Sequence, residues 1–245
     1  MAFRIFFFLL LLCLSPVQSA FAQVDASHGE NTKPPPIIMP RDARSIAAYH
    51  VMAMTAIRDR PKSFEFGVFR SYYTRTDDYD PIGETTRQKV VGLAYTIQND
   101  PDPAVRKQAF DEYGALVTAH LANVDVVSQA YILAQEDKIF GDPKFFEWMR
   151  KGLLRNLVKS GDGSSLVRAY DAMTLGEEAM LMNVLGLKVL KTESANSANI
   201  YYNTHLVQGP KSPEPYWMFV DVSRPMAALE QKKAQKMGEL KIEKQ

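Results

Sequence analysis

The chain contains one cysteine in 245 residues, Cys13, which lies in an apolar stretch near the N-terminus. From residue 23 onward there is no thiol, which excludes disulfides, a cysteine nucleophile and zinc–thiolate sites from that part of the chain. Leu10–Leu12 precede Cys13 without the small residue expected before a lipidated cysteine, so lipid anchoring is the less favoured alternative.

Long apolar runs are also missing. The longest at the N-terminus, IFFFLLLLCL at 5–14, is shorter than the ~20 residues that span a bilayer. Arg4 precedes it, Ser15-Pro16 breaks it, and Ala20-Phe21-Ala22 supplies an A-x-A cleavage pattern. These features predict a signal peptide at 1–22 and an exported protein, periplasmic or secreted, with no membrane span.

The chain has no excess of either charge. It contains 29 basic and 28 acidic residues, and loss of residues 1–22 removes only Arg4, which leaves 28 of each. This balance gives no electrostatic basis for binding nucleic acid or an anionic membrane. A 46% hydrophobic and 23% charged composition is that of a globular protein.

Catalytic and metal-binding motifs are absent as well. The sequence has no His-x-x-x-His, no Gly-x-Ser-x-Gly, no phosphate-binding glycine loop and no Asp-rich calcium loop, and we predict no metal and no cofactor. His28 lies in a proline-rich linker, whereas His50 and His120 lie on apolar helical faces, where we expect hydrogen-bonded core histidines. His205 shares a strand face with Tyr201 and Asn203, which could line a pocket or form an outward polar face.

Proline and periodicity divide the chain into parts. Residues 23–40, with Pro34-Pro35-Pro36, are typical of an extended linker. Residues 41–160 have helical periodicity over 41–60, 82–98, 103–122, 124–140 and 143–160, with an aromatic segment between the first two. The last two helices, joined by Gly141-Asp142-Pro143, resemble a tetratricopeptide pair, although no 34-residue repeat is visible.

The period becomes extended in residues 161–225. Strands are predicted at 166–173, 187–194, 199–207 and 216–222, and a short helix lies between the first two. We therefore predict one α+β domain at 41–225, in which a tetratricopeptide-like helical layer precedes a small antiparallel sheet of about four strands. The charged tail at 226–245 is expected to be a solvated helix or a frayed end.

Two blocks resemble a known family. The segments SGDGSSLVRAYDAMTLGEEAMLMNVLGLKV at 160–189 and YWMFVDVSRPM at 216–226 are similar to blocks of the domain-of-unknown-function family 4919, mostly exported bacterial proteins. The resemblance covers roughly residues 64–226 and implies an Arg-x-x-Tyr segment at 70–73, a turn at 79–81 and a Gly-Asp-Gly turn before the sheet. It implies no activity or cofactor. The chain departs from the family pattern at Ala179 and Asn203, where Tyr and Asp are expected.

Glu177 and Glu178 are the most prominent acidic pair. Thr174 and Glu177 have the spacing of a capping box, in which the hydroxyl accepts from the amide of residue 177 and the carboxylate reaches back to the amide of residue 174. Consecutive helical residues point ~100° apart, so the two carboxylates cannot easily flank one substrate atom. Glu178 shares its face with Leu181, so it is the one expected to enter any cleft.

Two sequence features remain open to both a structural and a binding interpretation. Gly161-Asp162-Gly163 could bind calcium or phosphate, but glycines in this position more simply turn the chain toward the sheet. Strand aromatics could form a carbohydrate or peptide platform if they are exposed, but aromatic residues in strands are usually core. These strand aromatics are Tyr201, Tyr202, Tyr216 and Trp217.

Two functions are compatible with these features. The first is a non-enzymatic binding or interaction module of the bacterial cell envelope, with a protein or glycan partner. The second is a periplasmic hydrolase that uses Glu178 or His205 with Asp171. Convergence of these three side chains in a concave pocket would favour the hydrolase.

Overall fold

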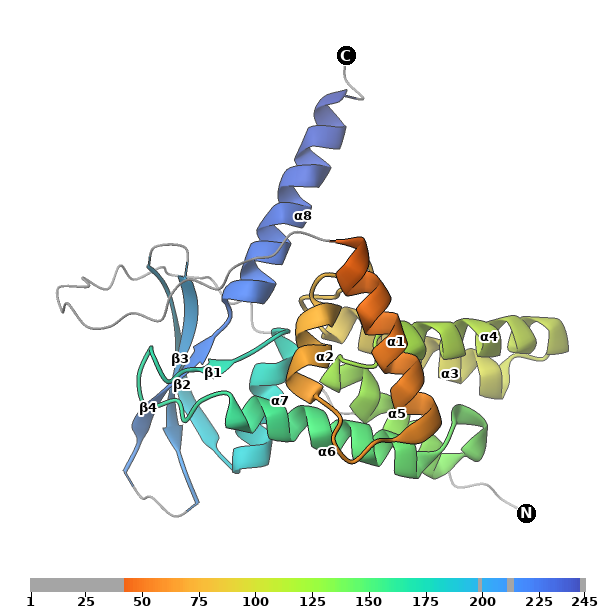
Figure 1. Cartoon of the computed structure of the whole chain (residues 1–245), viewed down its shortest axis with the longest axis horizontal. Helices are drawn as coiled ribbons and strands as arrows, with labels where there is room; N and C mark the ends of the chain where they lie inside the picture. Colours follow the sequence, from red (N-terminus) through yellow and green to blue (C-terminus); the bar gives the residue numbers. More distant parts are fainter. Residues whose placement is uncertain (1–41, 198–199, 211–213, 243–245) are drawn as a thin grey trace.

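The computed structural model describes residues 42–242 except 198–199 and 211–213, so the predicted signal peptide and linker lie outside the described residues. The described chain is helical first and forms its sheet near the C-terminus, as the α+β prediction requires (Figure 1). In order, the elements are α1 (Ala43–Asp59), α2 (Phe66–Tyr73), α3 (Glu84–Asn99), α4 (Pro103–Ala119), α5 (Val124–Glu136), the 3-10 helix η1 (Lys138–Phe140), α6 (Pro143–Lys159), β1 (Tyr170–Asp171), α7 (Gly176–Leu185), β2 (Lys188–Ser197), β3 (Ile200–Gln208), β4 (Tyr216–Asp221) and α8 (Ser223–Ile242).

Short polar side chains begin four of the described α-helices. The side chains of Asp42, Asp102, Asn123 and Asp142 each accept a hydrogen bond from a backbone amide of the helix that follows. Such caps satisfy amides that have no partner within the helix. Proline occupies the first position of α4 and α6, where its missing N–H costs nothing.

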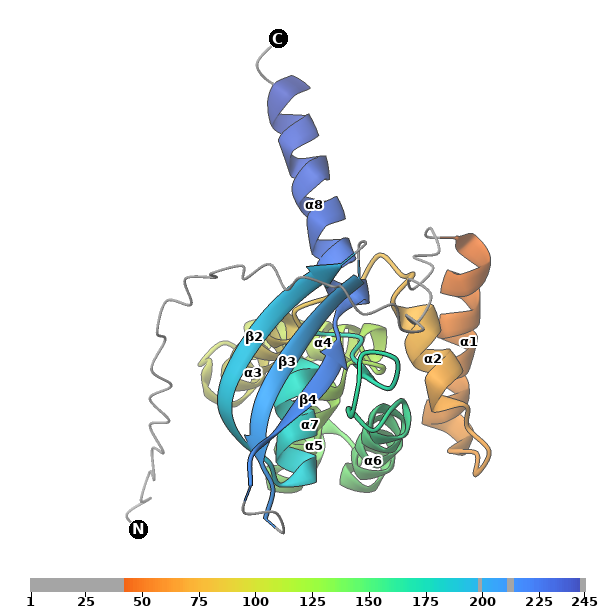
Figure 2. The same ribbon diagram turned by 90° about the vertical axis from the view of Figure 1, so that its left-hand side faces the viewer.

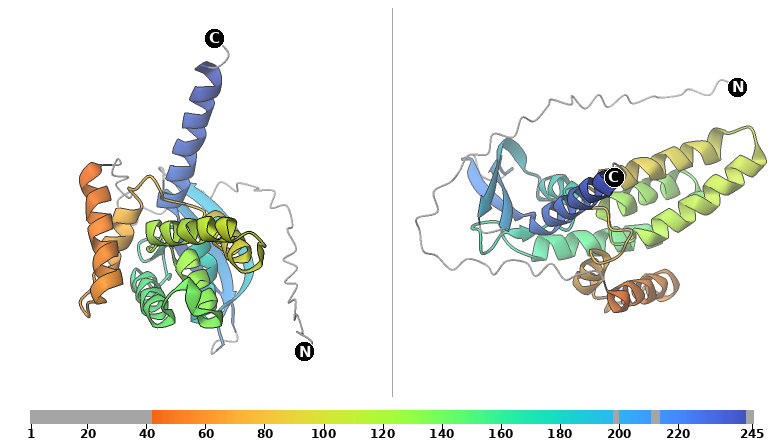
Figure 3. Two further views of the ribbon diagram at one scale, coloured as in Figure 1. Left: turned by 90° about the vertical axis from the view of Figure 1, so that its right-hand side faces the viewer. Right: turned by 90° about the horizontal axis from the view of Figure 1, so that it is seen from above.

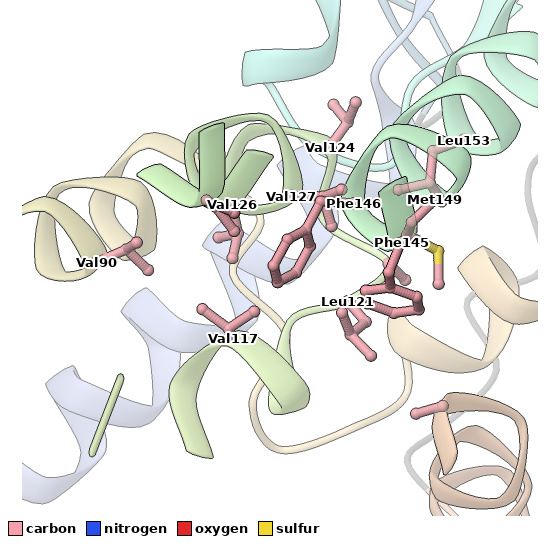
Figure 4. Packing of buried hydrophobic residues seen from close by; sticks show 14 of the residues in the cluster. Val90, Val117, Leu121, Val124, Val126, Val127, Phe145, Phe146, Met149 and Leu153 are labelled. Atoms are coloured by element: carbon pink, nitrogen blue, oxygen red, sulfur yellow. The ribbon is translucent and has the colours of Figure 1, made fainter. Parts of the chain in front are cut away.

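Consecutive helices pack side by side in the N-terminal layer. α3 lies along α4, and α5 lies along α6 (Figures 1 and 3). Their core is made of Val90 from α3, Val117 from α4, Val126 and Val127 from α5, and Phe146 from α6, all buried (Figure 4). The helical periods of the sequence therefore correspond to the packed faces of these helices.

The buried face of α1 differs from the prediction. Its buried residues are Ser45, Tyr49, Ala53 and Ala56. His50 is exposed, so the prediction that it is a core histidine is wrong. The cause is Tyr49, which stacks on Phe69 with ring centroids 4.9 Å apart and donates from its hydroxyl to the Ala119 carbonyl, and which thereby shifts the buried face by one residue.

The four-stranded sheet has the order β1-β4-β3-β2. β3 pairs antiparallel with β2 and β4, whereas β1 pairs parallel with β4, so the sheet is mixed. The predicted strand at 166–173 is reduced to Tyr170–Asp171. The residues before it turn instead, because the Arg168 carbonyl accepts from the amides of both Asp162 and Gly163.

α7 covers one face of the sheet (Figure 2). Leu181 and Met182 of α7 pack with Val207, Met218 and Val220 of β3 and β4 in a second hydrophobic cluster. α7 also contacts α5 and α6, so it joins the sheet to the helical layer.

The charged C-terminal segment forms α8, which begins within the predicted domain and projects from the body of the protein (Figures 1 and 2). Ala228 packs against the helical core, Met226 packs against the sheet cluster, and the Lys232 ammonium donates to the Tyr79 carbonyl. Within residues 42–242, apart from the two gaps, no helix is long and apolar enough to cross a membrane.

Candidate functional site

Glu177 forms a fully buried ion pair with Arg70. The Glu177 Oε2 lies 2.6 Å from an Arg70 guanidinium nitrogen, and each side chain is 1% exposed. A second guanidinium nitrogen donates to Asn156 Oδ1 at 2.6 Å, and the first also donates to the Asp171 carbonyl at 3.3 Å. This pair links α2 to α7 across 107 residues, and periodicity alone contained no signal for it.

The predicted capping box is half correct. The Thr174 hydroxyl accepts from the Glu177 amide at 3.3 Å, as expected. The Glu177 carboxylate, however, reaches back to the amide of Met173 at 2.7 Å rather than to that of Thr174. Because Arg70 pulls the carboxylate into the interior, Glu177 is a buried anchor rather than a solvated first-turn charge.

Asp125 lies beside this ion pair and was missed by the sequence reasoning. It is 6% exposed, and its Oδ2 has no hydrogen-bond partner among the described residues. Burial, together with Glu177 and Glu84, raises its pKa from the usual 3.8 to about 7. The signal in the sequence is indirect. A Cβ atom on Gly83 would lie 2.4 Å from this oxygen and one on Gly176 would lie 2.1 Å from it, so both positions have glycine.

Glu178 faces the sheet and meets His205. The Glu178 Oε1 accepts from Asn203 Nδ2 at 2.6 Å, and its Oε2 lies 3.3 Å from His205 Nε2. That nitrogen is within ion-pair distance of the carboxylate, but the geometry does not make a hydrogen bond. On its other side, His205 Nδ1 lies 3.0 Å from the Thr192 hydroxyl. The predicted face of His205 and Asn203 is confirmed, and Thr192 is an addition to it.

Asp171 is held elsewhere. Its carboxylate lies 3.4 Å from the Arg224 guanidinium, and its backbone amide donates to the Ser160 hydroxyl at 2.8 Å. None of its hydrogen bonds or ion pairs involves Glu178 or His205. The structure therefore brings together two of the three predicted candidates.

His120 is the buried, hydrogen-bonded core histidine that was expected. Its Nδ1 lies 2.7 Å from the Tyr73 hydroxyl, and burial lowers its pKa. The same hydroxyl accepts from the Asp80 amide at 3.1 Å. In the part of the chain that the structure describes, no group of three or more His, Cys, Asp or Glu side chains could hold a metal ion.

The Gly161-Asp162-Gly163 segment is a turn whose carboxylate is already engaged. Asp162 accepts from the Ser164 amide and hydroxyl and pairs with Arg168. Gly163 has a φ of +69°, and its Cβ would lie 2.5 Å from Met218, so a side chain is excluded there. These contacts fit the turn interpretation.

The strand aromatics divide between core and surface. Tyr202 is buried at 4% exposure, whereas Tyr216 and Trp217 are 44% and 39% exposed. The expectation of a core position is therefore wrong for these two, which lie at the start of β4, at one end of the sheet. Tyr201 is half-buried, and its hydroxyl donates to Glu230 of α8 at 2.6 Å.

An apolar groove of about 320 Å³ lies in the helical layer, away from the sheet. Its walls come from the end of α1, from α4, from η1 and from the start of α6. The lining is mainly apolar and includes five aromatic rings: Phe110, Tyr113, Phe140, Phe145 and Phe146. Arg60 and Asp142 add an ion pair, and the Arg60 guanidinium lies 5.5 Å above the Phe145 ring.

The groove is lined by apolar residues of the segment 103–122, for which helical periodicity is predicted. Phe110, Tyr113, Val117 and Leu121 all line it. Figure 4 shows Val117 close to Phe146 and Leu121 close to Phe145, and these four residues line the groove. Phe110 is 41% exposed, and Ile57 and Ile139 at the edges are 39% and 48% exposed, so apolar side chains remain in contact with solvent here.

The sequence blocks that carry the family resemblance meet around the Arg70–Glu177 pair. The Tyr79 hydroxyl donates to the Met173 carbonyl, and the Leu175 amide donates to the Pro81 carbonyl at 2.9 Å. No protein-family model, curated protein or solved structure matches the chain. Membership of the family therefore stays a prediction.

Proposed function

We propose that this protein is an exported, non-enzymatic binding module of the bacterial cell envelope, and that it takes an apolar segment of a partner polypeptide in the groove between α1, α4, η1 and α6. The observation that supports the proposal is the groove itself. Binding sites are concave and mostly apolar, with few polar groups to orient the ligand, and volumes of roughly 300–1,000 Å³ are typical.

The polar groups of the groove also fit this use. The Tyr113 hydroxyl is already satisfied because it donates to the Phe140 carbonyl at 3.2 Å. The Arg60–Asp142 pair is more exposed, with side chains 38% and 45% accessible, and can orient the polar backbone of a bound segment. A partner that inserts aromatic or aliphatic side chains matches this lining, whereas a highly charged ligand does not.

A glycine in the wall allows a clean test. Gly114 lies in the groove lining, and a Cβ built on it meets no atom within 4 Å. Gly114→Leu should therefore fill the groove without strain in the fold. We expect at least a fivefold weaker binding of 1-anilinonaphthalene-8-sulfonate, measured by fluorescence titration, and loss of the proteins that the wild type captures from envelope extracts.

Gly92→Leu is the matched control. Gly92 is also an exposed helical glycine with open space around its Cβ, but it lies in α3 and does not line the groove. Both variants should unfold at or above the wild-type midpoint, because glycine is a poor helix former. Equal dye binding and equal capture by the two variants would exclude the groove as the binding site.

A second candidate function rests on one specific observation. Thr192, His205 and Glu178 form a chain of hydroxyl, imidazole and carboxylate, with separations of 3.0 and 3.3 Å. This is the order of groups in an activated hydroxyl nucleophile. In a hydrolase, the Thr192 oxygen would attack an ester or amide carbonyl, its proton would pass to His205 Nδ1 and then to the leaving group, and water would release the acyl group.

The exposed Thr192 makes this hydrolase candidate testable. A fluorophosphonate probe should label Thr192 covalently, as mass spectrometry would show, and Thr192→Ala and His205→Gln should both abolish labelling. Ser194→Ala is the control, because Ser194 is exposed on the same strand but hydrogen-bonds Asn203 rather than His205. An unlabelled Thr192 in the folded wild type would remove this candidate and leave the groove proposal intact.

A further inference from the structure

The Asp125 carboxylate packs against two glycines, Gly83 and Gly176, which come from separate segments. The loop at 80–83 and the start of α7 lie against each other here, because the Leu175 amide donates to Pro81 and the Gly176 amide donates to Ile82, at 2.9 and 3.0 Å. The Asp125 Oδ2 lies where a side chain on Gly83 or Gly176 would clash. The carboxyl of α5 therefore contacts both segments where they join.

One oxygen of this carboxyl has no partner to compensate for its burial. Its Oδ2 is buried without a hydrogen-bond partner among the described residues, which is costly for an ionised group. Proton uptake removes that charge and provides a hydroxyl donor near the Thr174 hydroxyl, because a Cβ on Gly83 would lie 2.4 Å from the Asp125 Oδ2 and 3.1 Å from the Thr174 oxygen. We infer that Asp125 is a proton-operated latch that holds the 80–83 loop and the start of α7 against α5.

The charges around Asp125 favour the protonated form. Glu177 from α7, Glu84 from α3 and Asp80 from the loop all raise its pKa, whereas Arg87 from α3 lowers it. Burial is the largest cause, and the result is a pKa of about 7. Hydrogen bonds from Arg87 lower the pKa of Glu84, so Glu84 stays ionised while Asp125 titrates.

The direction of the pH effect follows from this shift. The latched state binds the Asp125 proton with a pKa of about 7, and an opened state has the usual value of 3.8. Protons therefore favour the latched state. Opening increases as the pH rises from about 4 to about 7, by at most roughly tenfold per pH unit, and is constant above pH 7.

The latch acts on the element that joins the two parts of the protein. α7 carries Glu177 toward the helical layer and Glu178 toward the sheet. Loosening of its first turn at neutral pH would weaken both contacts, whereas mild acid would tighten them. The inference does not depend on the groove or on the Thr192 cluster.

Hydrogen exchange of the two latch amides tests the inference. In the full chain, protection of Leu175 and Gly176, corrected for the intrinsic pH dependence of exchange, should fall on the order of 50-fold between pH 5 and pH 7.5. Amides of α6 around Met149 should change little. Asp125→Asn, which mimics the neutral carboxyl, should abolish the pH dependence, and Asp111→Asn, an exposed carboxylate of α4, should preserve it.

Two results would overturn the latch. One is a pH-independent protection of the Leu175 and Gly176 amides in the wild type, and the other is an unchanged pH dependence in Asp125→Asn. If Asp125→Asn fails to fold, the carbon-13 titration of the Asp125 carboxyl in the wild type decides the question. A midpoint near 7 supports the latch, and a midpoint near 4 overturns it.

Discussion

Glu177 and Glu178 are adjacent in the sequence, but their side chains contact different parts of the protein. Glu177 is buried against Arg70 and joins α7 to the helical layer, whereas Glu178 is 13% exposed and meets His205 on the sheet. Helix geometry explains the division, because consecutive side chains point ~100° apart and α7 lies between the two parts of the protein. Two identical carboxylates thus make different structural contacts because of the surfaces they face.

Loss of the Glu177 charge should destabilise the protein more than any other change considered below. Glu177→Gln leaves the Arg70 guanidinium buried without a counter-charge, and it should lower the free energy of unfolding by about 3–5 kcal/mol. Urea denaturation followed by tryptophan fluorescence would measure this loss. Replacement of both partners, as in Arg70→Met with Glu177→Leu, should recover part of the stability, because an apolar pair needs no charge compensation.

A loss below 1 kcal/mol in Glu177→Gln would contradict the assignment of different structural roles to the two carboxylates. It would mean that Glu177 is no more important to the fold than a surface carboxylate. The double variant gives an independent check, because a buried pair that stabilises through its charges would make the apolar replacement worse than the single change. Recovery in the double variant instead indicates that the cost lies in the unpaired arginine.

Periodicity predicted the local part of this arrangement. Helical spacing put Glu178 on the face of Leu181, and strand alternation put His205 beside Asn203, as the structure confirms. It could not identify Arg70, because a pair separated by 107 residues depends on how the helices pack. The burial of Asp125 is reflected in the sequence only by Gly83 and Gly176. A glycine can be required for many structural reasons, so these two did not identify Asp125.

Tertiary contacts that sequence periodicity does not contain also explain the errors in the predicted fold. The helical period predicts α1 but points to His50 as buried, whereas the structure buries the adjacent Tyr49, because the stacking of Tyr49 on Phe69 is a tertiary contact. The strand at 166–173 had the composition of a strand, yet the turn closed by the Arg168 carbonyl left only two residues to pair with β4. Tertiary context overrides local propensity in such short segments.

Loss of the Thr174 hydroxyl, which hydrogen-bonds the Glu177 amide, should have an effect of intermediate size. Its buried hydroxyl accepts from the Glu177 amide at 3.3 Å, which is a long hydrogen bond. Thr174→Ala should therefore cost about 1 kcal/mol of unfolding free energy, within the ~0.5–2 kcal/mol range of N-terminal caps. Thr174→Ser, which keeps the hydroxyl, is the control, and an equal loss in both variants would assign the effect to packing of the methyl group.

The smallest effect is expected on the Glu178 side. Glu178→Gln retains an oxygen to accept from Asn203, and the 3.3 Å contact between Glu178 and His205 is not a hydrogen bond of good geometry. We therefore expect a loss of about 1 kcal/mol or less in the same urea denaturation experiment. If Glu178→Gln instead matched the loss of Glu177→Gln, both carboxylates would be structural anchors. A small loss of unfolding free energy would mean that the fold does not require the Glu178 charge. The carboxylate could then take part in ligand binding or in a reaction.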